Sequence, residues 1–388
     1  MFTIKTLNTI SPKGLSRLEP GQFTIDDQAG DPDGIILRSY KMHDMEFGDS
    51  LLAVARAGAG VNNIPVERCT EKGIVVFNTP GANANSVKEL VISGMLLSSR
   101  KIVEGVNWSR SLEGVGDLEK TVEGGKKDFA GPEIMGKKLA VIGLGAIGVM
   151  VANAANDLGM EVIGYDPYIS VESAWGLRAN VGRAASLESA VSDCDFISLH
   201  VPLMDNTRGM VNKKLISKMK PGVRILNFAR GPLVDDDDIL EALESGPVAR
   251  YITDFPNERL VANPYVIPVP HLGASTPEAE ENCAVMAASQ ISHYLLHGNI
   301  VNSVNFPMIQ MEFSTNVRLL ILNRNIPAMV GQITSILAER KINIADMINK
   351  HRGEVACTII DIDGDISDES LKKVEEIEGV IRARVIRK

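Results

Sequence analysis

Three glycines with a fixed spacing carry the most specific chemistry in the sequence. Gly143, Gly145 and Gly148 form a G-x-G-x-x-G motif that follows an apolar run and opens a helix-like segment. Such glycines allow a tight turn, a close approach of the backbone to a diphosphate, and close packing of the helix on its strand. Asp166 ends the next apolar run, and an acid there accepts ribose hydroxyls and repels a 2′-phosphate. The pattern predicts a dinucleotide site that prefers NAD to NADP.

Hydride transfer from a hydroxyl group also needs a base and a cation, and the sequence offers one candidate for each. His271 follows an apolar run and precedes a helix-like segment, and imidazole exchanges protons near neutral pH. Arg230 follows another apolar run, at a strand end where ligands gather in parallel α/β sheets. Its guanidinium can hold a carboxylate with two hydrogen bonds. Taken alone, the histidine also fits a packing role and the arginine a surface salt bridge.

These groups must be positioned by strands and helices, and short apolar runs ending in Gly, Asn or Pro alternate with helix-length segments along most of the chain. We expect strands within residues 34–40, 51–58, 73–81, 139–142, 195–202, 222–231, 250–255 and 264–271. We expect helices within 86–100, 146–158, 207–220, 234–246 and 275–298, and a surface loop over 112–127. Strands that alternate with helices indicate parallel sheets. The expected fold class is α/β, with two doubly wound parallel-sheet domains of the Rossmann or flavodoxin-like type.

A third unit begins near Val317. Its apolar runs and helix-like segments follow the order β-α-β-β-α-β over about 70 residues, which is typical of the ferredoxin-like fold. We expect a small C-terminal domain that the segment 299–316 joins to the rest of the chain.

The composition is that of an ordinary globular protein. The chain has 388 residues, of which 45% are hydrophobic and 23% charged, with a net charge of −9. This acidity argues against nucleic acid as a partner. The four cysteines stand far apart, so neither a metal site nor a disulfide framework is expected. No secretory signal or membrane-spanning run is visible, so we expect a cytoplasmic protein without a membrane partner.

Several motifs carry a resemblance to a known family. NTPGANANSVKELVI, VIGLGAIG, LHVPL, LNFARGPLVD and PHLGASTPEA occur in the order found in the D-isomer-specific 2-hydroxyacid dehydrogenases, over residues 34–305. The resemblance implies NAD-dependent oxidation of a small 2-hydroxy acid. It also implies an active site of one arginine, one glutamate and one histidine.

The family's catalytic arginine and histidine fall on Arg230 and His271. Its D-V-F-x-x-E segment lines up with residues 253–258, which places the glutamate on Glu258 and displaces the aspartate onto Asp254. His271 would then take the proton of the C2 hydroxyl, Glu258 would orient His271, and Arg230 would bind the substrate carboxylate. Asp254 stays the alternative for the carboxylate.

By the same resemblance, a set of loop residues would contact NAD: Thr79, Gly143, Gly145, Ala146, Ile147, Gly148, Asp166, Val201, Pro202, Phe228, Ala229, Arg230, Asp254, His271, Gly273 and Ala274. The chain most resembles the branch of the family that oxidises D-3-phosphoglycerate in the first step of L-serine biosynthesis. That branch's substrate-binding residues fall on Arg38, Ser39, Arg56, Ala59, Gly60 and Val61. Two arginines just past strands of an acidic protein favour a phosphorylated substrate over an uncharged one.

The third unit resembles an ACT domain, a small module that senses amino acids. The effector-binding residues of relatives inhibited by serine fall on Asn323, Asn325 and Asn343, although relatives carry a histidine in place of Asn323. The resemblance implies L-serine as a possible effector. A role in dimerisation alone is the open alternative. Because ACT domains pair side by side, we expect a homodimer or homotetramer.

These expectations divide the chain into a substrate-binding domain (1–97 and 273–305), an NAD-binding Rossmann domain (98–272) and an ACT regulatory domain (315–388). Two other functions remain open. One is a reductase of hydroxypyruvate, glyoxylate or a related 2-keto acid. The other is an NAD(H)-sensing regulator that resembles the C-terminal-binding corepressors.

Overall fold

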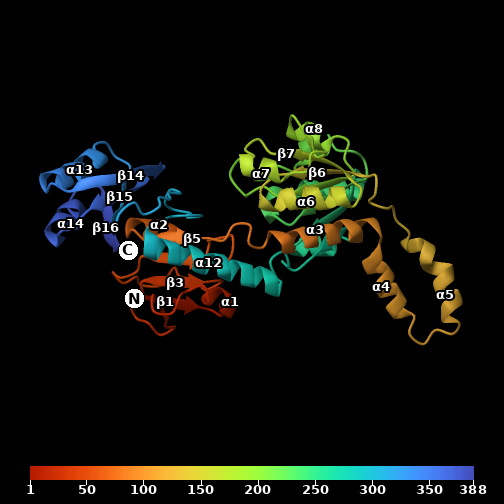
Figure 1. Ribbon diagram of the computed structural model, residues 1–388. Helices are drawn as coiled ribbons and strands as arrows, with labels where there is room; N and C mark the ends of the chain where they lie inside the picture. Colours follow the sequence, from red (N-terminus) through yellow and green to blue (C-terminus); the bar gives the residue numbers. More distant parts are fainter. The chain divides into compact units, whose positions relative to one another are not determined.

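The computed structural model describes residues 1–388 and divides them into two compact units. Unit 1 comprises Met1–Ala82 and Glu280–Lys388, and unit 2 comprises Asn83–Ala279. Both ends of the chain therefore belong to unit 1 (Figure 1). None of the helices combines the length and the apolar composition that crossing a membrane would require.

A parallel five-stranded sheet forms the first part of unit 1, in the order β2-β1-β3-β4-β5. Its strands are β1 (Phe2–Leu7), β2 (Phe23–Ile25), β3 (Gly34–Leu37), β4 (Ala53–Arg56) and β5 (Val75–Phe77). The order reverses between β1 and β3, as it does in flavodoxin-like sheets. Nearly every residue of β3, β4 and β5 is buried, which explains their continuous apolar runs.

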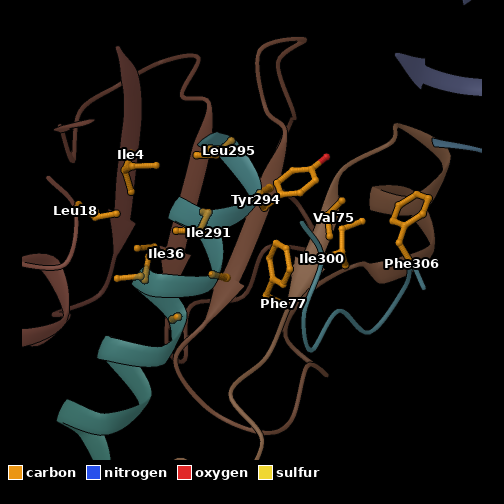
Figure 2. Close-up of a cluster of buried hydrophobic side chains, with 14 of the residues drawn as sticks. Ile4, Leu18, Ile36, Val75, Phe77, Ile291, Tyr294, Leu295, Ile300 and Phe306 are labelled. Atoms are coloured by element: carbon orange, nitrogen blue, oxygen red, sulfur yellow. The ribbon is translucent and has the colours of Figure 1, made fainter. Parts of the chain in front are cut away.

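Helices cover both faces of this sheet: α1 (Pro12–Leu15), α2 (Val66–Glu71) and the long α12 (Pro277–His297). Figure 2 shows the core that α12 forms with the strands, including Ile4, Ile36, Phe77, Ile291, Tyr294 and Leu295. A Cβ atom at Gly34 would lie only 2.8 Å from Cδ1 of Ile291, so glycine in β3 allows α12 to approach this closely. The Thr276 hydroxyl accepts the backbone N–H of Ala279 at 3.1 Å, next to the start of α12.

Seven parallel strands form the sheet of unit 2, in the order β12-β11-β10-β9-β6-β7-β8. They are β6 (Lys138–Ile142), β7 (Glu161–Tyr165), β8 (Gly182–Arg183), β9 (Phe196–Leu199), β10 (Val223–Asn227), β11 (Val248–Thr253) and β12 (Val266–Pro268). The order reverses between β6 and β9, which is the point where doubly wound sheets bind their ligands. The expected α/β class with two parallel sheets is confirmed.

Six of the helices of unit 2 connect these strands, and the other three precede β6 in the chain. They are α3 (Ala84–Ser99), α4 (Ile102–Ser111), α5 (Leu118–Gly125), α6 (Ala146–Asp157), α7 (Val171–Gly176), α8 (Leu187–Val191), α9 (Lys213–Ile216), α10 (Asp236–Ser245) and α11 (Glu258–Ala262), with short 3₁₀ turns η1 (Lys126–Phe129) and η2 (Gly231–Leu233). Helix α3 packs on α6 and β10, so its contacts group it with unit 2. The finer division into substrate, cofactor and regulatory domains stays a prediction.

Two expectations about local structure are wrong. Residues 112–127 are not a loop, since α5 occupies Leu118–Gly125, and Trp108 of α4 meets Phe129 with ring centroids 5.1 Å apart. Phe129 belongs to the 3₁₀ turn that follows α5, so this aromatic contact joins the end of that segment to α4. Residues 207–220 form only the single turn α9, because Val211 pairs with Val234 as an isolated bridge instead of continuing a helix. The sequence interpretation also missed β1 and β2.

The C-terminal part of unit 1 is an antiparallel four-stranded sheet, in the order β14-β15-β13-β16. Its elements are β13 (Val317–Arg324), α13 (Met329–Glu339), β14 (Asn343–Arg352), β15 (Val355–Asp363), α14 (Asp368–Glu375) and β16 (Val380–Arg387), which confirms the expected β-α-β-β-α-β order. One face packs against its own two helices, with Ile333 and Val374 fully buried. Leu320 and Cys357 of the other face belong to the same core as α12.

Buried charges also join this C-terminal part to the end of α12. Arg318 and Asp361 are fully buried and paired through two hydrogen bonds, at 2.7 and 3.0 Å. The remaining Nη1 of Arg318 donates to the carbonyls of His297 and Met311, at 2.9 and 2.8 Å. Because each of the three nitrogens of this guanidinium donates to an acceptor, the charge of the buried pair is compensated, and loss of one partner would leave an uncompensated charge.

Candidate active site

The glycine loop connects β6 to α6 at the switch point of the unit 2 sheet. Gly143 has φ +93°, and a Cβ there would lie 2.7 Å from the carbonyl carbon of His200. A Cβ on Gly148 would lie 1.9 Å from the carbonyl oxygen of Gly143. A Cβ on Gly145 would meet no protein atom within 4 Å. Two of the glycines are therefore required by packing, and the third keeps space open in front of the helix.

That space faces the first turn of α6. Gly145 is the residue that precedes the helix, and no side chain caps the N–H groups of the first turn. Ala146 and Ile147 begin the helix. Free N–H groups at the start of a 12-residue helix, together with its dipole, form an anion-binding site. The loop can thus hold a diphosphate without any charged side chain.

Asp166 lies directly after β7 and beside this loop. Its Oδ2 accepts the backbone N–H of Leu144 at 2.8 Å, and its Oδ1 accepts that of Tyr168 at 2.8 Å. Both oxygens are thereby fixed in orientation, and each keeps further lone pairs for hydroxyl donors. This geometry fits a carboxylate that binds ribose hydroxyls.

Asn227, at the end of β10, organises the loop that carries Arg230. Its Oδ1 accepts the N–H groups of Ala229 and Arg230, and its Nδ2 donates to the carbonyl of Arg230 and to the Tyr251 hydroxyl. The Arg230 side chain is exposed, and its Nη1 donates only to the carbonyl of Ala229 at 2.6 Å. Sequence reasoning missed Asn227, although a polar residue at the end of an apolar strand was a usable signal.

His271 lies in the loop between β12 and α12. Its backbone has φ +51°, in the left-handed region that non-glycine residues rarely adopt. Its exposed ring contacts the ring of Phe255, with centroids 4.9 Å apart. A strained backbone at a candidate proton-transfer residue fits the tendency of strain to gather at functional sites.

Two carboxylates compete for the role of partner to His271, and they differ in burial. Glu258 begins α11, is exposed, and makes no side-chain hydrogen bond or ion pair. Asp254 directly follows β11 and is 1% exposed. Its Oδ2 accepts the backbone N–H of Gly273 at 3.2 Å, whereas its Oδ1 has no partner.

Electrostatics also distinguish Asp254. Burial raises the pKa of its carboxyl, and the charges of His271 and Arg230 oppose this rise. Asp254 therefore lies within electrostatic reach of both other candidate groups. No hydrogen bond joins either carboxylate to the ring of His271 in this structure.

The other predicted cofactor residues of unit 2 gather in loops after strand ends. Val201 and Pro202 follow β9, Phe228 and Ala229 follow β10, and Gly273 and Ala274 follow His271. The Phe228 ring is buried against Gly94 of α3, so only its backbone could meet a ligand. Thr79 belongs to unit 1, where it is fully buried beside Cys283.

The predicted substrate residues lie together in unit 1, after the ends of β3 and β4. Nε of Arg56 donates to the carbonyl of Arg38 at 3.0 Å, which ties the two arginine positions to each other. Both arginines are half-buried. The backbone N–H of Ser39 donates to Asn8 at 3.0 Å. The exposed Ala59, with Gly60 and Val61, continues the loop after β4.

The three predicted effector residues are not brought together within one chain. Asn323 and Asn325 lie at the end of β13, and the Asn323 side-chain oxygen is buried without a partner. Asn343 begins β14 and donates to Asp363 at 2.7 Å. The pairing of β13 and β14 with β15 puts Asn343 at the opposite end of the sheet.

Comparison with known proteins agrees with these features. Residues 92–273 match the family described as D-isomer specific 2-hydroxyacid dehydrogenase, NAD binding domain. A D-3-phosphoglycerate dehydrogenase of Haemophilus influenzae is 32% identical over 373 residues, which cover 91% of this chain and 86% of the relative. The enzyme of that name from Escherichia coli K12 is 30% identical over 98% of this chain and 95% of its own length.

A solved structure gives the same result. The NAD⁺-bound 3-phosphoglycerate dehydrogenase of Entamoeba histolytica superposes with a TM-score of 0.60 at 27% identity, covering 79% of this chain and 99% of that one. Its cofactor agrees with the glycine loop and Asp166 described above. Fold, cofactor motif and relatives together place the chain in the family of D-isomer-specific 2-hydroxyacid dehydrogenases, which are NAD-dependent oxidoreductases.

Proposed function

We propose that the protein oxidises D-3-phosphoglycerate to 3-phosphohydroxypyruvate with NAD, the first step of L-serine biosynthesis. The observation that carries the choice of substrate is the pair of arginines after β3 and β4, Arg38 and Arg56. The names of the relatives described above support the same choice.

The residues of unit 2 fit NAD on three separate observations. The position of Gly145 leaves space before α6, Asp166 presents fixed carboxylate oxygens, and the buried Oδ1 of Asp254 lacks a partner. That oxygen can accept an N–H from the carboxamide of a nicotinamide. When bound, NAD supplies the acceptor for the hydride that leaves C2 of the substrate.

His271 would exchange the proton in this reaction. During oxidation its imidazole takes the proton of the C2 hydroxyl, and in the reverse direction it returns that proton. A carboxylate beside the ring stabilises the resulting cation and selects the tautomer. We assign this role to Glu258, following the family resemblance. Asp254 is the alternative, because it lies within electrostatic reach of His271.

Arg230 would hold the substrate's carboxylate. A guanidinium has five N–H donors, and only one nitrogen of this side chain has a partner in the structure, the carbonyl of Ala229. The remaining donors can form a bidentate pair with a carboxylate. The Asn227 side chain forms hydrogen bonds with the backbone of Arg230, so the arginine would be held in place before the substrate carboxylate binds.

Arg38 and Arg56 would bind the phosphoryl group, and Ser39, Ala59, Gly60 and Val61 would form the surrounding loops. The carbonyl of Ala59 already accepts the side-chain amide of Asn78 at 2.6 Å, which fixes that loop. Arginine suits a phosphoryl group because its planar fork matches the phosphate oxygens.

Self-association is supported by two exposed features. The β14 strand is a ten-residue sheet edge with mostly exposed side chains, and unpaired strand edges favour pairing with another chain. Helices α4 and α5 expose Ile102, Val106 and Leu118. We propose a homodimer or homotetramer, in which Asn323 and Asn325 of one chain and Asn343 of another would form an L-serine site. The C-terminal domain would then act as an ACT domain.

A reductase of unphosphorylated 2-keto acids is the second candidate. It is favoured by the ion pair that Arg38 already makes with Glu280, since a paired arginine is less available to a phosphoryl group.

Initial rates of NAD reduction with D-3-phosphoglycerate, beside D-glycerate and D-lactate, test the proposal. We expect turnover with the phosphorylated acid at least tenfold above the others in kcat/KM. Equal or better rates with D-glycerate would replace the proposal by the second candidate.

A further inference from the structure

One of the two proposed phosphoryl-binding arginines is held by an acid of α12. Oε1 of Glu280 lies 2.6 Å from Nη1 of Arg38, and both side chains are only partly exposed, at 45% and 39%. Glu280 is more than two hundred positions from Arg38 in the sequence, so only the fold of unit 1 brings them together. The inference that follows rests on the proposed phosphoryl site.

The backbone at Arg38 is fixed, whereas its guanidinium has a single anionic partner. The carbonyl of Arg38 accepts Nε of Arg56 at 3.0 Å and Nδ2 of Asn63 at 3.3 Å. No salt bridge other than that with Glu280 engages the Arg38 guanidinium. The side chain can therefore exchange one anion for another without moving the strand end.

The charges of this cluster lie close together. Cys283, one turn along α12, is buried, which raises the pKa of its thiol. The charges of Arg38 and Arg56 lower that pKa and the charge of Glu280 raises it, so all three groups lie within electrostatic reach of one buried atom. The cluster presents two positive charges and one negative charge to an incoming ligand.

We propose that Glu280 occupies Arg38 as an internal anion in the free enzyme and thereby lowers the affinity of this site for anionic ligands. A ligand must displace this single carboxylate charge to reach the arginine. A phosphoryl dianion carries more charge than the carboxylate and can displace it, whereas an uncharged hydroxyl cannot. Glu280 would thus weaken the binding of every anion at Arg38 and favour the release of the phosphorylated product.

Glu280→Gln tests this proposal with little change of shape. Because a partly exposed ion pair contributes little free energy, we expect the KM for 3-phosphohydroxypyruvate to fall about 2- to 5-fold in this variant. The inhibition constant of inorganic phosphate, measured as a competitor of the same substrate, should fall by a similar factor. High salt should reduce the differences between variant and wild type in both the KM and the inhibition constant, since salt screens exposed charges.

Glu281→Gln is the matched control. Glu281 is the next residue of α12, and its partner is Lys13 at 2.7 Å instead of Arg38. The control removes the same charge from the same helix turn, and we expect it to leave both constants unchanged. Thermal unfolding of both variants checks that neither change acts through the fold.

The opposite result would overturn the proposal. If Glu280 merely orients Arg38, the KM of the Glu280→Gln variant would rise, and equal values in both variants would also contradict an internal anion. Failure of the proposed function would appear elsewhere, as a wild-type enzyme without preference for the phosphorylated acid. In that case inorganic phosphate binding, measured by calorimetry on both variants, still decides the role of Glu280.

Discussion

The two parallel sheets of this protein prepare for anions in opposite ways. In unit 2, the start of α6 offers backbone N–H groups, and Gly145 keeps the approach open without any charged side chain. In unit 1, the ends of β3 and β4 carry Arg38 and Arg56, and an acid already occupies one of them. A backbone site has fixed dipoles and fixed geometry. A side-chain site can exchange partners, and its affinity can be tuned by neighbouring charges.

The largest effect should come from the group assigned to proton transfer. We expect His271→Ala to lower kcat by about 10²- to 10⁴-fold, because positioned acid–base catalysis contributes that much. NADH affinity, followed by fluorescence titration, should stay within twofold. His293→Ala, an exposed histidine of α12 in unit 1, is the control. Near-normal turnover of the His271 variant would remove the proposed mechanism.

Two alanine substitutions in the glycine loop separate its role in cofactor binding from its role in packing. A methyl group at position 145 meets no protein atom, so Gly145→Ala should keep the melting temperature and weaken NADH binding at least tenfold. A methyl group at position 148 would collide with the Gly143 carbonyl. Overpacking of this kind costs about 1–3 kcal/mol, so Gly148→Ala should lower the melting temperature by several degrees as well. Calorimetry measures the melting temperatures of the two variants, and titration measures their affinities for NADH. Equal melting temperatures of the Gly145→Ala and Gly148→Ala variants would contradict the packing argument.

The side-chain site should respond to the substrate's charge. Arg38→Ala removes charged hydrogen bonds worth about 1.5–3 kcal/mol, so the KM for the phosphorylated acid should rise about 10- to 100-fold. The KM for hydroxypyruvate should change far less, which steady-state kinetics with both acids would reveal. Arg17→Ala, an exposed arginine of unit 1, serves as the control. A parallel rise for both acids would mean that Arg38 does not read the phosphoryl group.

Asp166 should set the choice between NAD and NADP. Asp166→Asn keeps only one of the two oxygens that accept the N–H groups of Leu144 and Tyr168, and it removes the negative charge that repels a 2′-phosphate. We expect the preference for NADH over NADPH, as a ratio of kcat/KM, to fall about tenfold, from the loss of one charged interaction. An unchanged ratio would assign cofactor choice to another residue.

The smallest effect concerns the pH dependence of stability near the glycine loop. Burial lowers the pKa of His200 to about 4, whereas an unfolded histidine titrates near pH 6.5. Between these values the unfolded chain takes up a proton that the folded chain does not, so stability falls as the pH falls from about 6.5 to 4. His200→Asn should flatten this part of the melting-temperature profile. A profile parallel to that of the wild type would mean that His200 titrates normally.

The contrast between the sheets also explains what the sequence could predict. The backbone site was predictable because only glycine tolerates positions 143 and 148, so the fold leaves a visible motif. The β-α-β-β-α-β order of the C-terminal part was also predictable, because its apolar runs and helix-like segments follow one another in that order. Arg38 and Arg56 were found by their places after strands, and their roles remain proposals.

Features that depend on distant contacts were not predictable. The Glu280–Arg38 pair joins the two chain segments that make up unit 1, and the sequence around either residue gives no sign of the other. Residues 112–127 were taken for a loop because they are rich in Gly, Glu and Lys, and the contact between Trp108 and Phe129 cannot be seen in the sequence. The burial of Asp254 became visible only once β11 was placed in the interior of the sheet.

The most direct test of the account is NADH oxidation at equal concentrations of 3-phosphohydroxypyruvate and hydroxypyruvate, followed as kcat/KM for each acid. The account predicts a preference of at least tenfold for the phosphorylated acid, as expected if two arginines of unit 1 bind the phosphoryl group. Equal kcat/KM values, or a preference for hydroxypyruvate, would contradict the phosphoryl site and leave a general 2-keto acid reductase as the function.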